Sequence, residues 1–112
     1  MQRFIVVKFA VEGIHCWPEC PIPDVSFLRD PHRHMFYVKA TKLVTHNDRD
    51  VEIIMLKRDM MHFLNADFAN SKGTHNFGRM SCEEIAEGLI KEFDLKSCEV
   101  LEDNENGAYL EV

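Results

Sequence analysis

Two β-forming segments near the N-terminus, separated by a proline-rich stretch, constrain the fold of this chain most strongly. Phe4–Val11 is rich in β-branched and aromatic residues, and His34–Thr45 alternates between two sets of side chains. Both patterns predict strands. All four prolines of the chain lie between them, in His15–Pro31. We expect no regular element there, because proline lacks a backbone N–H donor and fixes φ.

Helical periodicity follows the second strand. Apolar residues in Ile54–Asn65 recur at the spacing of one helix face, which predicts a first helix. Ser81 and Glu84 form the Ser-x-x-Glu pattern of a capping box and predict the start of a second helix. The segment from Asn65 to Gly78 is polar and irregular, so we expect a connection there.

The C-terminal residues predict a hairpin, because Cys98–Leu101 and Ala108–Val112 flank the turn-forming stretch Asp103–Gly107. The resulting order, β-β-α-α-β-β, predicts an α+β fold with a four-stranded antiparallel sheet and two helices on one face. A length of 112 residues fits a single domain over residues 1–112.

Charge and hydropathy argue against several classes of protein. With 13 Lys+Arg against 19 Asp+Glu, the net charge is −6, so we expect no nucleic-acid partner. No apolar run approaches the ~20 residues of a membrane helix, and we expect no membrane partner. The N-terminus leads straight into a strand and lacks a signal-peptide pattern, so we expect a cytoplasmic protein with reduced thiols.

Three histidines lie where the first two strands are expected to meet. His15 follows the first strand, and His32 and His34 stand two residues apart at the start of the second. Alternate residues of a strand point to one face, so His32 and His34 can reach one point in space. Pairing of the two strands would bring His15 beside them. Three imidazoles with an open fourth position are typical of a catalytic zinc site.

Two other interpretations of these histidines remain open. They could be unrelated loop residues, because a His-x-His pair is only weakly specific. Alternatively, Cys16 and Cys20 could form a zinc knuckle with His32 and His34, although the chain has no Cys-x-x-Cys pair. The other histidines are isolated in the sequence and are expected on the surface or on a helix face: His46, His62 and His75.

The segments FAVEGIHCW and PHRHMFYVKA carry the three histidines and resemble motifs of a known family. They are similar to the 6-pyruvoyl-tetrahydropterin synthases and their bacterial relatives, the 6-carboxytetrahydropterin synthases of queuosine biosynthesis. The second segment resembles the family's His-Gly-His motif, with Arg33 in place of glycine. The resemblance implies that His15, His32 and His34 are zinc ligands.

Later segments extend the resemblance over almost the whole chain. VEIIMLK is similar to the stretch before the family's first helix, and MSCEEIAEGL to the segment that opens its second helix. EVLEDNENGAYLEV resembles the family's C-terminal strand-turn-strand segment, which carries the glutamate that binds the substrate. The resemblance implies that Glu102 binds the N–H edge of a pterin ring and that Glu83 belongs to the substrate site.

The fold implied by the resemblance is the T-fold, whose β-β-α-α-β-β subunits assemble as homotrimers or homohexamers with closed barrels. The implied function is that of a zinc-dependent lyase that eliminates phosphate from a dihydroneopterin-triphosphate-type substrate. Zinc would polarise the side-chain hydroxyls of this substrate as a Lewis acid.

The proton-transfer groups of the family are altered in this sequence. Leu28 stands where the family has its catalytic cysteine, and Cys16 and Cys20 in the same loop are the candidate replacements. Asp67 matches the spacing of the family's catalytic aspartate, but Phe68 follows it where the family has histidine. The candidate replacements for that histidine are two others in the chain, His75 and His62.

Two functional hypotheses follow from the altered relay. In the first, the chain is an active pterin synthase with relocated catalytic groups. In the second, it keeps zinc and a pocket for a pterin or purine-like ligand without the lyase reaction. Loss of a general acid or base lowers a rate by about 10²–10⁴, which makes turnover the discriminating measurement.

Overall fold

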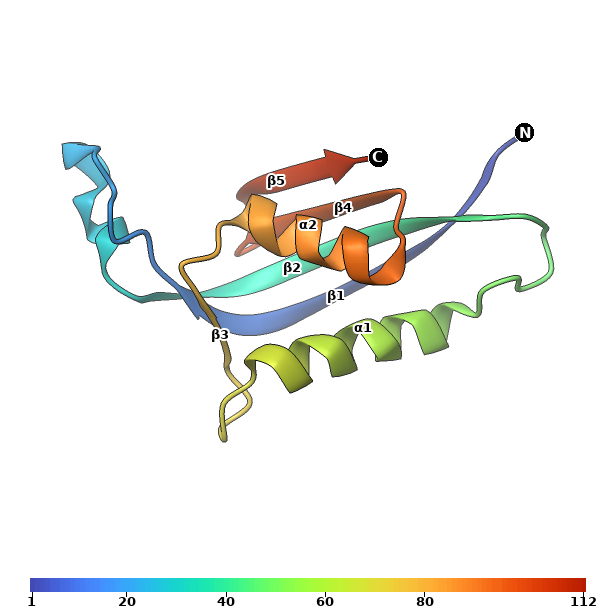
Figure 1. The fold of residues 1–112 in the computed structure, drawn as a ribbon, viewed down its shortest axis with the longest axis horizontal. Coiled ribbons are helices and arrows are strands. Elements are labelled where there is room, and N and C mark those ends of the chain that lie inside the picture. Colours follow the sequence, from blue (N-terminus) through green and yellow to red (C-terminus); the bar gives the residue numbers. More distant parts are fainter.

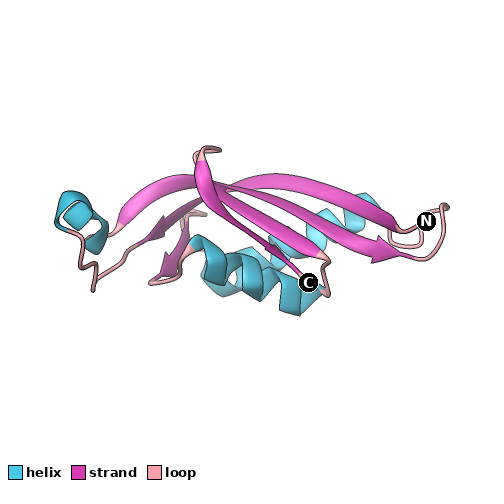
Figure 2. Cartoon of the chain, turned by 90° about the horizontal axis from the view of Figure 1, so that it is seen from above, coloured by secondary structure: helices cyan, strands magenta, loops and turns pink.

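A curved five-stranded sheet carries the α-helices on one of its faces (Figure 1 and Figure 2). The computed structural model describes residues 1–112. The strands are β1 (Arg3–His15), β2 (His32–Val44), β3 (His75–Gly78), β4 (Ser97–Glu102) and β5 (Asn106–Glu111). The helices are the 3-10 helix η1 (Pro23–Arg29) and the α-helices α1 (Ile53–Phe68) and α2 (Cys82–Phe93). The predicted α+β class is confirmed.

The sheet has the strand order β3-β1-β2-β4-β5. β1 and β2 form a long antiparallel ladder, from Arg3 opposite Val44 to His15 opposite His32. β4 pairs antiparallel with β2, and β5 with β4, as the predicted hairpin requires. These four strands make the antiparallel part of the sheet.

The predicted number of strands was wrong, because β3 adds a fifth strand that runs parallel to β1. β3 falls in the stretch that was expected to be an irregular connection. Its four residues are too few, and too polar, to give an alternating pattern. Pairing with the end of β1 and burial of Phe77 in the core hold it in place.

The proline-rich segment also differs from the prediction, since it contains η1. Pro23 begins this helix at a position where no backbone N–H is needed, so proline is tolerated there. None of the η1 residues is buried, and the segment projects from one end of the sheet (Figure 1). β1 itself continues beyond Val11 and ends at His15, which is therefore a strand residue.

Side chains at the helix ends explain where the two α-helices begin. The carboxylate of Glu52 accepts a hydrogen bond from the Met55 backbone N–H at the start of α1. Ser81 and Glu84 form the predicted capping box at the start of α2. α1 continues past its predicted end to Phe68, whose ring packs against Phe77 at 5.1 Å between centroids.

The hydrophobic core lies between the sheet and the two α-helices. Met60 and Leu64 of α1 and Leu89 of α2 are at most 1% exposed, and they pack over the inner face of the sheet. Phe36 and Val100 on that face are fully buried. This packing fixes the ends of β1, β2 and β4 relative to one another. None of the helices has the length and apolar composition needed to cross a lipid bilayer.

Candidate metal centre

The pairing of β1 with β2 brings the three predicted zinc ligands together. His15 is directly opposite His32, and His34 is opposite Gly13, with all three side chains on the inner face. The imidazole centroids lie 4.6 Å apart for His15 and His32, 5.6 Å for His15 and His34, and 5.1 Å for His32 and His34. The interpretation as unrelated loop histidines is therefore wrong.

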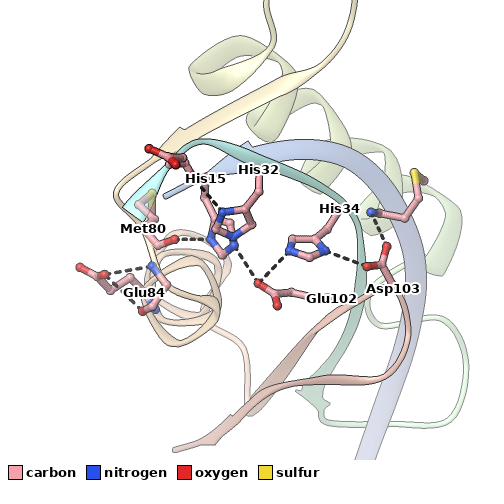
Figure 3. A network of polar contacts seen from close by, with 10 residues as sticks. His15, His32, His34, Met80, Glu84, Glu102 and Asp103 are labelled. Atoms are coloured by element: carbon pink, nitrogen blue, oxygen red, sulfur yellow. Dashed lines mark hydrogen bonds and ion pairs between the residues drawn. The ribbon is translucent and has the colours of Figure 1, made fainter. Parts of the chain in front are cut away.

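Glu102 joins the three histidines from the end of β4, where it pairs with Phe36 in register. One nitrogen of each imidazole and a carboxylate oxygen of Glu102 all lie within 4.8 Å of one another. Figure 3 shows the carboxylate pointing toward the imidazoles. We call these four residues, His15, His32, His34 and Glu102, the metal group.

The Nδ1 atom of each imidazole is held by a hydrogen-bond acceptor. His15 Nδ1 lies 2.8 Å from the Met80 carbonyl oxygen, and His32 Nδ1 lies 2.8 Å from the Asp30 carbonyl oxygen. A carbonyl oxygen only accepts, so each Nδ1 must carry the proton and donate it. The neutral ring then has its lone pair on Nε2, the form in which histidine binds a metal.

Asp103 holds the third imidazole in the same way. Its Oδ2 atom lies 2.7 Å from His34 Nδ1, and its Oδ1 accepts from the Met35 backbone N–H at 3.0 Å. The hydrogen bond from His34, followed by that from Met35, lowers the pKa of Asp103 from its ordinary value of 3.8. Asp103 is thus a charged acceptor that fixes the ring orientation of a metal-group histidine.

Two of the three Nε2 atoms are buried and make no hydrogen bond, although a carboxylate lies close to them. Nε2 of His15 and Nε2 of His34 are both enclosed by protein without a matched donor or acceptor. Glu102 Oε2 lies 2.7 Å from His15 Nε2 and 3.6 Å from His34 Nε2. In the neutral tautomer, a nitrogen lone pair here faces a carboxylate lone pair, which is repulsive. A positive charge, either a proton on His15 or a metal ion, is needed between them.

The donor set fits a divalent metal ion. Three imidazoles and a carboxylate are ligands that zinc and other first-row ions accept, at Zn–N distances of about 2.0–2.1 Å. Ligand atoms around a tetrahedral zinc lie about 3.3 Å apart, so small side-chain movements from the observed spacing close the site. The metal group contains no cysteine, and so the zinc-knuckle interpretation was wrong.

A cavity of about 640 Å³ opens beside the metal group. His15, His32 and Glu102 form part of its wall, and the start of α2 forms another part. The other lining residues come from the loop after β1, from η1, from the segment that leads into α2 and from the start of β5: Cys16, Trp17, Pro18, Glu19, Leu28, Arg79, Met80, Ser81, Cys82, Glu83, Glu84, Asn106 and Gly107. A small ligand in this cavity can reach both a bound metal and the Glu102 carboxylate.

Two of the other predicted site residues line this cavity. Glu83 lies in the first turn of α2 and is exposed. Cys16 follows β1 and is half-buried, with its backbone N–H bonded to the Gly78 carbonyl. Neighbouring Cys82 is an unreactive thiol, because burial first, and then the charges of Glu102 and Glu83, raise its pKa to about 12.

The remaining predicted catalytic residues are not brought to the cavity. Cys20 is buried, and its Sγ atom contacts the carbonyl oxygens of Ile22 and Val25. Asp67 is exposed in the last turn of α1.

His75 is buried, which contradicts its expected position on the surface. Its Nδ1 contacts the Glu12 carbonyl oxygen at 3.0 Å and its Nε2 contacts Asn65 Oδ1 at 2.8 Å, so both ring nitrogens are occupied. His75 therefore joins β3 to α1 and β1. Its two ring contacts are with residues 10 and 63 positions away along the chain, so no local pattern predicts its burial.

Comparison with protein-family models and with curated proteins gives no match to this sequence. We therefore infer the function from the geometry of the metal group and its cavity.

Proposed function

We propose that the chain is a zinc protein of the pterin synthase type, which binds one zinc ion through His15, His32 and His34. The observation that carries this proposal is the hydrogen-bonding pattern that the three imidazoles share. Each Nδ1 is held by an acceptor, and the Nε2 atoms of His15 and His34 are buried without hydrogen bonds and face the Glu102 carboxylate. Zinc bound there would act as a Lewis acid toward hydroxyl or carbonyl oxygens of a ligand.

Glu102 is proposed to bind the ring of that ligand. Its carboxylate borders both the metal group and the cavity, and its side chain is 27% exposed. A carboxylate accepts two parallel hydrogen bonds from the amidine edge of a pterin or guanine-like ring. Zinc and the adjacent Glu102 carboxylate would then bind a small hydroxylated heterocycle from the same wall of the cavity.

The geometry supports ligand binding more strongly than the lyase reaction. The predicted relay residues Asp67 and His75 lie outside the cavity, and Cys20 is buried against carbonyl oxygens. One observation favours the lyase as a second candidate: Cys16 lines the cavity beside His15. In that case Cys16 would be the proton-transferring group.

Incubation of the zinc-loaded protein with dihydroneopterin triphosphate, with and without acetaldehyde trapping, tests these two functions. Product formation that falls about 10²–10⁴-fold in Cys16→Ser, at unchanged zinc content, supports the lyase. Binding of dihydroneopterin or of its triphosphate without turnover supports ligand binding without the lyase reaction. Absence of both binding and turnover, for pterins and guanine-like compounds alike, contradicts the pterin assignment.

We also propose that the subunit assembles as a homotrimer or homohexamer. β5 forms one edge of the sheet, and β3 covers only the last residues of β1, which leaves most of β1 as a second unpaired edge. The face without helices exposes apolar side chains: Phe4, Val6, Tyr37, Leu43 and Tyr109. Closing a barrel would cover such edges. A monodisperse monomer in light scattering at micromolar concentration would contradict the assembly.

A further inference from the structure

The cavity beside the metal group has an excess of acidic side chains. Four carboxylates line it, those of Glu19, Glu83, Glu84 and Glu102, and the only lysine or arginine is Arg79. The Arg79 guanidinium already contacts the Glu19 carboxylate. The cavity therefore offers no free lysine or arginine to an incoming anion. Glu83 and Glu84 have no basic side chain opposite them, and Glu102 faces the His15 imidazole at 2.7 Å.

The positions of these carboxylates determine where the negative charge lies. Glu102 faces the metal group, where a divalent ion would offset its charge. Glu84 accepts hydrogen bonds from the Ser81 backbone N–H and hydroxyl, so it is fixed at the start of α2. Glu83 is exposed in the same turn and has no ion-pair partner. Even with a divalent metal ion bound, the cavity keeps one negative charge in excess.

We propose that this cavity selects an uncharged heterocycle bearing hydroxyl groups and discriminates against ligands with phosphate groups. The inference rests on the proposed function, because zinc and Glu102 must hold the ring. N–H and O–H donors satisfy carboxylates, whereas a phosphate tail would approach Glu83 and Glu84 without a free arginine or lysine to bind it. The overall charge of −6 adds to this repulsion at long range.

Two ligands that share one ring test the inference directly. Calorimetry on zinc-loaded protein would compare 7,8-dihydroneopterin with its triphosphate, and elemental analysis afterwards would check that the zinc remains bound. We expect the unphosphorylated compound to bind at least about tenfold more tightly at low ionic strength. The difference should shrink with added salt, because the Debye length falls from about 30 Å at 0.01 M to about 3 Å at 1 M.

A charge-matched pair of variants links the selectivity to the cavity. Glu19→Gln removes a lining carboxylate and frees Arg79, so it should shift the affinity ratio toward the triphosphate. Glu87→Gln makes the same charge change on α2, where Glu87 pairs with Lys91 outside the cavity, and should leave the ratio unchanged. Equal shifts in the two variants would mean that only net charge matters, which would overturn the role of the cavity.

The failure of this inference can be told apart from the failure of the proposed function. If the wild-type protein binds the triphosphate as tightly as dihydroneopterin at low salt, the charge selection is wrong and the proposed function stands. If the zinc-loaded protein binds neither compound, the proposed function is wrong, and the inference fails with it.

Discussion

Asp103 Oδ2 lies 2.7 Å from His34 Nδ1, and Asp103 is the one side chain among the three acceptors that orient the metal-group imidazoles. The other two acceptors are backbone carbonyls, which no substitution removes. Asp103 has a positive φ of 54°, in the turn after β4, so the backbone of this turn directs its carboxylate at His34. The orientation of His34 therefore depends on a single replaceable group.

Replacing Asp103 with asparagine should weaken zinc binding by about 10- to 100-fold. Asparagine tolerates the positive φ and keeps an acceptor oxygen, but its side chain has no charge to polarise the His34 ring. Competition with a chromophoric chelator would measure the affinity. Asp48→Asn, at an exposed position that pairs with Arg49, is the matched control. Unchanged zinc affinity in Asp103→Asn would contradict an orienting role.

Purified protein should contain one zinc ion per chain when no chelator is used. His32→Ala should lose it, because the variant lacks a ligand of the metal group. His46→Ala should keep it, since His46 is exposed and lies outside that group. Elemental analysis would measure both. Absence of stoichiometric zinc in the wild-type protein would remove the basis of the proposed function.

The sequence predicted the parts of the site that depend on local patterns. His32 and His34 share a face because strand side chains alternate, and antiparallel pairing brings the end of β1 to the start of β2. The Ser81–Glu84 capping box predicted the start of α2 for a similar reason, since its partners are three residues apart. The alternation of strand side chains and the capping box are each encoded within a few residues.

Features that depend on distant contacts could not be predicted in this way. Asp103 is 69 residues from His34, and nothing in its neighbourhood distinguishes it from other turn aspartates. His75 is buried by contacts with Glu12 and Asn65, from different elements. The distance between Glu102 and His15 likewise depends on the register of β4 against β2. That register was not evident from either strand alone.

The zinc-free protein should lose stability in acid partly through Glu12. Hydrogen bonds from Thr74 and then Arg33 lower the pKa of Glu12 from its ordinary value of 4.5, so folding favours the ionised carboxylate. This contribution is complete above about pH 4.5 and is lost as the pH falls through the lowered pKa. Glu12→Gln should therefore reduce the free energy of unfolding at neutral pH, and by progressively less below pH 4.5.

Urea unfolding at several pH values would measure that difference. Glu92→Gln is a suitable control, because Glu92 is exposed on α2 and its side chain makes no hydrogen bond or ion pair. If the difference between the wild type and Glu12→Gln were constant across the acid range, the contacts of Glu12 would not be coupled to its ionisation.

Glu102→Gln should separate ring binding from metal binding. Glutamine keeps the shape of the side chain, but one acceptor oxygen becomes an N–H donor that faces a donor on the ligand ring. An unsatisfied buried donor costs about 1–3 kcal/mol, so affinity for dihydroneopterin should fall about tenfold or more. Zinc content should stay at one ion per chain, because three histidines remain.

Glu105→Gln, exposed in the same turn, is the control for calorimetry. Loss of zinc from Glu102→Gln would instead make Glu102 a metal ligand, and equal ligand binding would make it a bystander.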